Sequence, residues 1–311
     1  MCTAISYQNG DHYFGRNLDL NKGYNEQVTI TPRNYTLHFR NGQNIFHHYA
    51  MIGMATVSNN YPLYYEATNE KGLSMAGLNF PGNAVYLPPK DNMTNITPFA
   101  FIPWILGRFR TVAQVKEIID KINLIDQPFN QAYKLTPLHW MIADKNASIV
   151  VEPMADGLKV YENPVGVLTN NPPFDYHMHN LTNYLNLSRN QPDSCLWNQL
   201  QVTPYSRGMG AIGLPGDLSS ASRFIRAAYM KLNSADNKNE TSEVSQFFHI
   251  LDAVQQQRGA VLVDDRYEIT VYSSCCNTSK GIYYYKTYHN NQITAVDIHK
   301  ENLDSERLIS Y

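Results

Sequence analysis

Short runs of apolar, β-branched and aromatic residues, separated by Gly, Asn and Pro, fill the first 80 residues of the chain. Residues 3–7 and 12–15 flank the turn sequence Asn9-Gly10-Asp11, which predicts two strands joined as a hairpin. Further runs of this kind are residues 27–31, 51–57, 63–67 and 73–78. These runs are typical of strands, and we expect them to continue the hairpin into a first sheet.

Apolar residues recur at helical spacing in three later segments. Residues 111–122 begin with Thr111 and Gln114 in a capping-box pattern, and residues 219–232 begin with serines suited to capping. The third segment is residues 244–258, with Gly259 as a stop signal. We also expect a more buried helix at residues 99–106, although periodicity alone does not distinguish it from a strand.

Strand patterns return on both sides of the last two predicted helices. A second antiparallel sheet is predicted from four short β-rich runs, residues 138–143, 148–152, 158–162 and 165–169. The last quarter of the chain predicts a meander of residues 269–275, 281–288 and 292–297, whose final turn is Asn290-Asn291. Because strands and helices come in separate blocks, the pattern favours an α+β fold with antiparallel sheets.

Composition narrows the class of protein. The chain has 311 residues, of which 43% are hydrophobic and 17% charged, so it can bury a large core, and we expect a single domain over residues 1–311. A net charge of -2 favours a small-molecule partner over nucleic acid or an anionic membrane. No signal peptide or membrane-spanning run is evident, which predicts a cytoplasmic protein. The four cysteines form no disulfide framework, and the histidines complete no metal-ligand set, so we expect no metal and no cofactor.

Cys2 directly follows Met1, so removal of the initiator methionine would give a chain whose first residue carries a thiol and a free α-amine. Such an amine titrates near pH 7.7 to 8.0 and a thiol near about 8.5, so one residue can supply both nucleophile and base. A cysteine at this position is usually incidental when it stands alone, because a nucleophile also needs an orienting base and charge stabilisation.

Three polar residues could provide that support. Arg16 and Asp19 end the second strand of the predicted hairpin, where an arginine would favour a thiolate and a carboxylate would orient an ammonium. Asn170 lies where a predicted strand runs into a loop with Pro172, and its amide could donate to an oxyanion. Taken singly, these motifs are more often a surface salt bridge and a turn.

Nine blocks in order from Cys2 to Asp297 closely resemble the choloylglycine hydrolase family, which includes bile salt hydrolases and penicillin V acylases. They are CTAISY, FGRNLD, NEKGLSMAGLNFPG, LHWMIAD, SIVVE, GVLTNNPPFDYH, GLPGDLSSASRFIRAAY, FFHILD and GIYYYKTYHNNQITAVD. The resemblance implies the four-layer αββα sandwich of the N-terminal nucleophile hydrolases, with two antiparallel sheets between helical layers. It also implies a homo-oligomer, most simply a tetramer.

At individual positions the resemblance implies a catalytic set. Cys2 matches the nucleophile that removal of Met1 exposes. Arg16 matches an arginine beside the thiol, and Asp19 matches an aspartate bonded to the α-amine. This set implies hydrolysis of a linear amide through a thioester.

The resemblance extends to three further positions. Asn79 and Asn170 match two contributors to the oxyanion hole, and Arg223 matches a second arginine of the site. The bile salt branch of the family usually has Asn at position 79, where the penicillin-cleaving branch tends to have Tyr. Asn79 therefore favours glycine- or taurine-conjugated bile salts as substrates.

A steroid needs a broad apolar wall, and the YPLYY run with neighbouring positions could supply one. The residues expected to bind substrate are Leu18, Tyr24, Tyr64, Tyr65 and Leu135, with Tyr61 and Leu63 from the same run. A penicillin V or acyl-homoserine-lactone acylase remains an alternative that differs only in this pocket. A catalytically silent steroid or lipid binder is a second alternative, which the complete catalytic set disfavours.

Overall fold

The computed structural model describes residues 1–40, 42, 44–235 and 239–311, and in it the first two strands form the predicted hairpin. Both strands are almost entirely buried, since they lie inside a six-stranded antiparallel sheet. In spatial order its strands are β12 (Val167–Leu168), β1 (Cys2–Asn9), β2 (Asp11–Leu20), β17 (Ile269–Asn277), β18 (Ile282–Thr287) and β19 (Asn290–Asp297). The start of β1 is therefore held on a rigid element.

An eight-stranded antiparallel sheet packs against the first. Its strands, in spatial order, are β11 (Gly157–Glu162), β10 (Ser148–Met154), β9 (Leu138–Ala143), β6 (Ser74–Asn79), β5 (Tyr61–Asn69), β4 (Met51–Ser58), β3 (Gln27–Thr31) and β20 (Ile309–Ser310). Three short pairs lie outside both sheets, namely β7 (Thr94–Ile96) with β8 (Ile122–Leu124), β13 (Cys195–Trp197) with β14 (Leu200–Val202), and β15 (Leu262–Val263) with β16 (Arg266–Tyr267).

The predicted division of strands between the sheets is wrong. The sequence pattern groups the first hairpin with β3 to β6, but the hairpin pairs with β17 from the last quarter of the chain. Strands β9 to β11, expected to form a separate sheet, extend β6 instead. Periodicity identifies a strand, whereas its partner depends on which faces bury one another in the folded chain.

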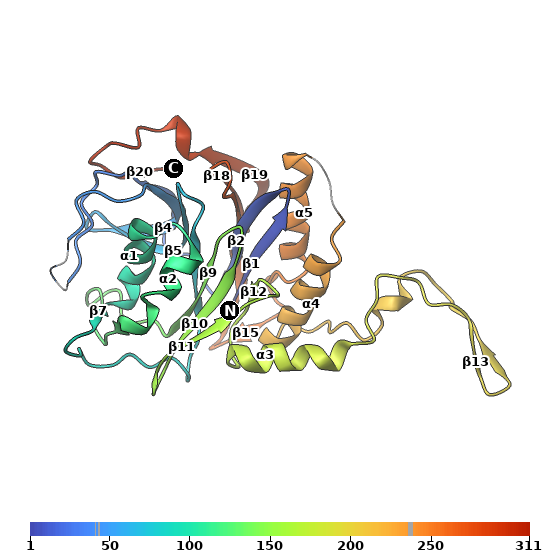
Figure 1. The fold of residues 1–311 in the computed structure, drawn as a ribbon. Coiled ribbons are helices and arrows are strands. Elements are labelled where there is room, and N and C mark those ends of the chain that lie inside the picture. The colour runs from blue at the N-terminus through green and yellow to red at the C-terminus, as the bar shows by residue number, and fades with distance from the viewer. Residues whose placement is uncertain (41, 43, 236–238) are drawn as a thin grey trace.

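Helices cover the outer face of each sheet, as Figure 1 shows. Helices α1 (Phe101–Arg108) and α2 (Val112–Lys116) share an apolar cluster with the eight-stranded sheet. Helices α3 (Phe174–Asn180), α4 (Ser220–Leu232) and α5 (Glu240–Asp252) lie on the side of the six-stranded sheet. The order of layers is helix, sheet, sheet, helix, so the predicted α+β class and the αββα sandwich are confirmed.

Several helix ends differ from the sequence pattern. Thr111 caps α2 by accepting from Gln114 N, but the helix stops at Lys116 and the chain continues through a 3₁₀ turn, Ile119–Lys121, into β8. Residues 99–106 are helical, in a 3₁₀ turn, Pro98–Ala100, followed by α1. Helix α5 begins and ends several residues earlier than predicted, and the last hairpin turns before Asn290.

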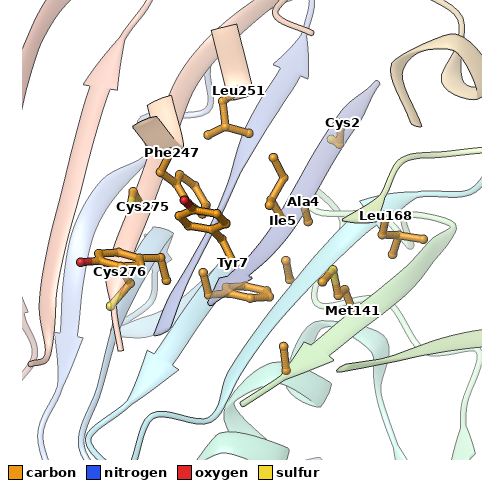
Figure 2. Packing of buried hydrophobic residues seen from close by; sticks show 14 of the residues in the cluster. Cys2, Ala4, Ile5, Tyr7, Met141, Leu168, Phe247, Leu251, Cys275 and Cys276 are labelled. Carbon is orange, nitrogen blue, oxygen red and sulfur yellow. The ribbon is translucent and has the colours of Figure 1, made fainter. Parts of the chain in front are cut away.

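The core near Cys2 joins both sheets and the helices above them. Figure 2 shows Phe247 and Leu251 of α5 beside Tyr7 of β1, and Met141 of the eight-stranded sheet in the same cluster. The rings of Tyr7 and Phe247 lie 6.3 Å apart in an edge-on arrangement. Each buried ring stabilises the packed layers by roughly 1.5 to 3 kcal/mol, which fixes the hairpin that carries Cys2.

The hairpin of β13 and β14 was not predicted, and it projects away from the layered body (Figure 1). Large apolar side chains on and beside it are exposed, namely Leu196, Trp197, Leu200 and Tyr205.

No helix within the described residues is long and apolar enough to span a bilayer.

Candidate active site

Cys2 begins β1, with its Cα opposite that of Leu18 in β2, and is 2% exposed. Side chains alternate along a strand, so Cys2 and Ala4 share one face of the hairpin, as do their partners Leu18 and Arg16. The backbone nitrogen of Cys2 donates to Asn170 Oδ1 over 2.8 Å. Strand register therefore places Leu18 and Arg16 on the same face of the hairpin as Cys2, and a hydrogen bond adds Asn170.

The guanidinium of Arg16 is fully buried between the two sheets. Its Nη1 donates to the carbonyls of Gly77 (2.6 Å) and Tyr65 (3.1 Å), and its Nε lies 3.9 Å from Glu66 Oε2. Burial acts to lower the pKa of Arg16, but the attraction of Cys2 and of nearby acidic groups outweighs it, so the pKa is raised. Arg16 is thus a permanent positive charge in the neighbourhood of the thiol.

Asp19 and Arg223 face each other on the helical side of the hairpin. Arg223 Nη1 donates to the carbonyl of Cys2 (2.6 Å) and to Thr3 Oγ1 (2.8 Å), and lies 4.0 Å from Asp19 Oδ2. Burial raises the pKa of Asp19, and the charge of Arg223 opposes this shift. Asp19 Oδ1 accepts from Thr270 Oγ1 over 2.6 Å, which fixes the carboxylate beside the first residues of β1.

The side chain of Asn170 links the remaining predicted residues. Its Oδ1 accepts from both Cys2 N and Arg223 Nη2, each at 2.8 Å. Its Nδ2 donates to the backbone carbonyl of Asn79 over 2.7 Å. An amide nitrogen carries two protons, and within the described part of the chain only the proton directed at Asn79 has an acceptor. The second proton is available to an oxygen of a substrate.

The backbone of Asn170 is fixed from two helices. Its N–H donates to Ser220 Oγ (2.8 Å) at the start of α4, and its carbonyl accepts from His177 Nε2 (2.8 Å) in α3. Burial lowers the pKa of His177 to about 4, so the ring is neutral near pH 7 and donates through Nε2. The amide is therefore held in one orientation before any substrate arrives.

A cavity of about 390 Å³ lies along β5 and the loop before β9. Two of its lining residues, Tyr65 and Gly77, are those whose carbonyls bind Arg16, so the cavity adjoins Arg16, although none of the six predicted catalytic residues is part of its wall. Aromatic and aliphatic side chains form most of its wall, and they include Tyr24, Leu63, Tyr64, Tyr65, Phe99, Phe129, Tyr133 and Leu135. Its volume is in the range of small-molecule sites.

Two of the residues expected to bind substrate are elsewhere. Leu18 is 3% exposed, packs in the core and does not line this cavity. Tyr61 lines a separate hollow of about 980 Å³, which contains none of the predicted catalytic residues. Phe99 and Phe129, which sequence reasoning missed, contribute to both spaces.

Sequence reasoning also missed the buried polar residues behind the site. Thr270 donates a hydrogen bond to Asp19, Ser220 accepts one from Asn170 N, and Glu66 accepts hydrogen bonds from the hydroxyls of Tyr272 and Ser274. A polar residue on the buried face of an otherwise apolar strand is the signal that could have identified Glu66. No group of three or more His, Cys, Asp or Glu residues is arranged for a metal ion in the ranges that the structure describes.

Comparison with known proteins identifies the family. The profile described as "Linear amide C-N hydrolases, choloylglycine hydrolase family" matches residues 2–311. The chain is 55% identical to the "Bile salt hydrolase/transferase" of Lactiplantibacillus plantarum and 40% identical to that of Clostridium perfringens; each alignment covers 100% of this chain and 96% of the relative.

Solved structures agree with the fold. A variant of the conjugated bile acid hydrolase from Clostridium perfringens superposes with a TM-score of 0.93 at 39% identity, over 100% of this chain and 96% of that chain. The penicillin V acylase from Agrobacterium tumefaciens gives a TM-score of 0.78 at 18% identity, over 99% and 90% of the two chains, which bears on the fold alone. The fold is that of the N-terminal nucleophile hydrolases, and the chain belongs to the choloylglycine hydrolase family of linear amide C–N hydrolases.

Proposed function

We propose that this enzyme hydrolyses the amide bond of glycine- or taurine-conjugated bile salts, releasing the free bile acid and the amino acid. The observation that carries the proposal is the pair of 2.8 Å hydrogen bonds that Asn170 Oδ1 accepts from Cys2 N and Arg223. They bring an amide donor next to the only residue that can present both a thiol and, once Met1 is removed, a free amine. We further propose that residues 2–311 fold as one domain.

Removal of Met1 is part of the proposal. With Met1 present, the nitrogen of Cys2 is a peptide N–H, and the Met1 carbonyl accepts from Asp19 N over 2.9 Å. Cleavage of the Met1–Cys2 bond converts this nitrogen to an amine. Asn170 and the Asp19 carboxylate would then orient that amine beside the thiol.

The chemical steps then follow. The Cys2 thiolate, stabilised by Arg16, attacks the amide carbonyl, and the second proton of Asn170 Nδ2 and the side chain of Asn79 stabilise the oxyanion. The α-ammonium gives a proton to the departing amine as the carbon–nitrogen bond breaks. The amine then removes a proton from water, which attacks the thioester and releases the acid and the thiolate.

The cavity supports a steroid as the acyl group. Its wall of aromatic and aliphatic side chains suits a rigid apolar ring system, and it adjoins Arg16. The relatives at 55% and 40% identity are bile salt hydrolases/transferases by name, and they align over the whole chain. Side-by-side hydrolysis of glycocholate, taurocholate and penicillin V tests the assignment. Equal or higher kcat/KM on penicillin V would overturn the choice of substrate.

We also propose that the enzyme is a homo-oligomer, most simply a tetramer, with the β13–β14 hairpin as a contact. Leu196, Trp197 and Leu200 are 69%, 68% and 65% exposed on one projecting element, and burying such side chains between subunits would be favourable. Light scattering should give four times the 35.5 kDa chain mass. Trp197→Asp should lower that mass, whereas the control Phe46→Ser, outside the hairpin, should not. A parent protein that is monomeric would contradict the proposal.

A further inference from the structure

His139, on β9, is fully buried between the two segments that carry Asn79 and Asn170. Its ring stacks on Phe80, the residue after Asn79, with centroids 4.2 Å apart and planes 5° apart. Its Nε2 lies 2.9 Å from the carbonyl oxygen of Thr169, the residue before Asn170. One ring therefore contacts a sequence neighbour of each asparagine.

Glu152, on β10, lies on the opposite side of this ring. Its Oε1 is 3.0 Å from His139 Nδ1 and also accepts from the backbone nitrogen of Phe174, the first residue of α3, over 3.1 Å. Both side chains are 0% exposed. The pair thus connects two strands of the eight-stranded sheet to the loop that runs from Asn170 to α3.

The hydrogen bonds determine how many protons the pair holds. A carbonyl oxygen can only accept, so His139 Nε2 must carry a proton to bind Thr169. A contact of 3.0 Å between Nδ1 and a carboxyl oxygen also needs a proton, which belongs either to the ring or to Glu152. In both arrangements the pair holds one proton more than a neutral imidazole and a carboxylate.

We propose that His139 and Glu152 share this proton and act as a positioning pair for the oxyanion hole. The inference rests on the proposed function, because it assumes that Asn79 and Asn170 bind the oxyanion. Oxyanion donors act only over about 2.7 to 3.1 Å, so a small displacement of either segment would remove the stabilisation. The pair acts through Thr169 and Phe80 and does not contact substrate.

Two isosteric variants separate the contacts of the ring. In His139→Asn the amide nitrogen takes the place of Nδ1 and loses Thr169, whereas in His139→Gln it takes the place of Nε2 and keeps Thr169. We expect kcat on glycocholate to fall about tenfold or more in His139→Asn relative to His139→Gln. KM should change less than about twofold, because His139 does not line the cavity. Equal kcat values in the two variants would overturn the proposal.

The control is His12→Asn. His12 is also buried with both ring nitrogens hydrogen-bonded, to Ser6 and Thr278, but at the far end of β1 and β2. This variant should lose thermal stability and keep its kcat. The alkylation rate of Cys2 should be unchanged in His139→Asn, and a fall in parallel with kcat would mean that the nucleophile or the whole fold is disturbed, contrary to the proposal.

A measurement on the unaltered protein covers the case in which variants fail to fold. NMR of ¹⁵N-histidine-labelled enzyme at pH 7 should show a slowly exchanging proton between His139 Nδ1 and Glu152 in addition to the proton on Nε2, and the absence of a proton from the Nδ1 contact would overturn the inference. This readout needs no substrate. If the parent enzyme cleaves no conjugated bile salt, the proposed function fails while the shared proton stands. If it cleaves them and no proton lies between Nδ1 and Glu152, only the positioning pair fails.

Discussion

Asn170 illustrates how much of the site depends on one residue. Its side chain accepts from Cys2 and Arg223 and donates to Asn79, while its backbone is bound to α3 and α4. An amide that already has these partners loses little entropy when it binds an oxyanion, because its orientation is fixed in the folded protein. Asn170 is thus preorganised, because all of its hydrogen-bonding groups have partners in the protein except the one amide proton that would bind the oxyanion.

Cys2→Ala should abolish amide hydrolysis while the protein stays folded, because the change removes the nucleophile from a strand end and opens only a small cavity. Cys2→Ser should be severely impaired, since a hydroxyl is far harder to ionise than a thiol. Mass spectrometry of active enzyme should show that Met1 is absent. Normal turnover by protein that fully retains Met1 would rule out the N-terminal amine as base.

Replacing Arg16 by Leu should slow alkylation of Cys2 at pH 7 by roughly 10- to 100-fold and lower kcat, because the thiolate loses its nearby positive charge. The assay is best made with Cys195→Ser in all proteins, since Cys195 is exposed. Arg226→Leu is the matched control, because Arg226 is also buried and donates to carbonyls but contacts none of the reacting groups. An unchanged alkylation rate would remove Arg16 from its assigned role.

At the scale of the element, residues of β5 line both the 390 Å³ cavity and the 980 Å³ hollow. Tyr65 lines the 390 Å³ cavity near Arg16 and bonds to Thr56 Oγ1 over 2.9 Å, whereas Tyr61, four residues earlier, lines the separate hollow. Residues i and i+4 point to the same face of a regular strand, but register shifts between β4 and β5 at Met54/Ala55. The strand therefore presents two tyrosines to different surroundings.

Because Tyr65 and Tyr61 line different cavities, replacing each of them gives a matched pair of variants. Tyr65→Leu should weaken bile salt binding by about 1 to 3 kcal/mol, seen as a higher KM, with a smaller effect on kcat. Tyr61→Leu removes a similar ring that does not line the cavity, and we expect a smaller rise in KM, because Tyr61 only packs on Phe99 and Phe129 of the wall. Steady-state kinetics with glycocholate provides the measurement. A rise in KM of equal size in both variants would show that the steroid extends into the second hollow.

Helix α4 is a second element whose start positions residues of the predicted site. Ser219 caps it by accepting from Ser222 N, and Ser220 and Arg223 lie in its first turn. The cap fixes where the helix begins, so it also fixes the position of the residues that bind Asn170 and Cys2. Hydrogen bonds from the first turn of α4 therefore hold the start of β1 in place.

At the scale of the whole molecule, buried histidines link stability to pH. Burial lowers the pKa of both His12 and His177 to about 4, below the ordinary value of 6.5. Between these values the unfolded chain binds protons that the folded protein does not, so each histidine lowers stability as pH falls from about 6.5 to 4, by on the order of 2 kcal/mol.

Chemical denaturation of the parent and of His12→Asn between pH 4 and 7 measures this contribution. The difference between the two proteins cancels the effect of buried carboxyl groups such as Glu66, whose pKa burial raises. We expect the parent to lose more stability than the variant as pH falls. Parallel stability curves for the two proteins would show that His12 takes up no additional proton on unfolding.

Much of the site could be predicted from the chain alone. The predicted catalytic residues lie in motifs whose order and spacing resemble those of the family, and the structure brings Cys2, Asn170 and Arg223 into direct contact. The predicted places of Leu18 and Tyr61 in the substrate wall differ from those in the structure, and the contacts of His139 were not foreseen, because the side of a strand that meets a cavity depends on how the sheets are packed. Local pattern carries no information on that packing.

The sequence by itself determined most strands of the two large sheets, most of the helices, the α+β class and the chemistry available at Cys2, because these depend on local periodicity, on capping residues and on the position of one cysteine. Only the tertiary structure decided which strands share a sheet. It placed β2 beside β17, more than 240 residues away, and joined β9 to β6. Strand partners and buried polar pairs are settled by long-range burial and hydrogen bonding, which no short stretch of sequence specifies.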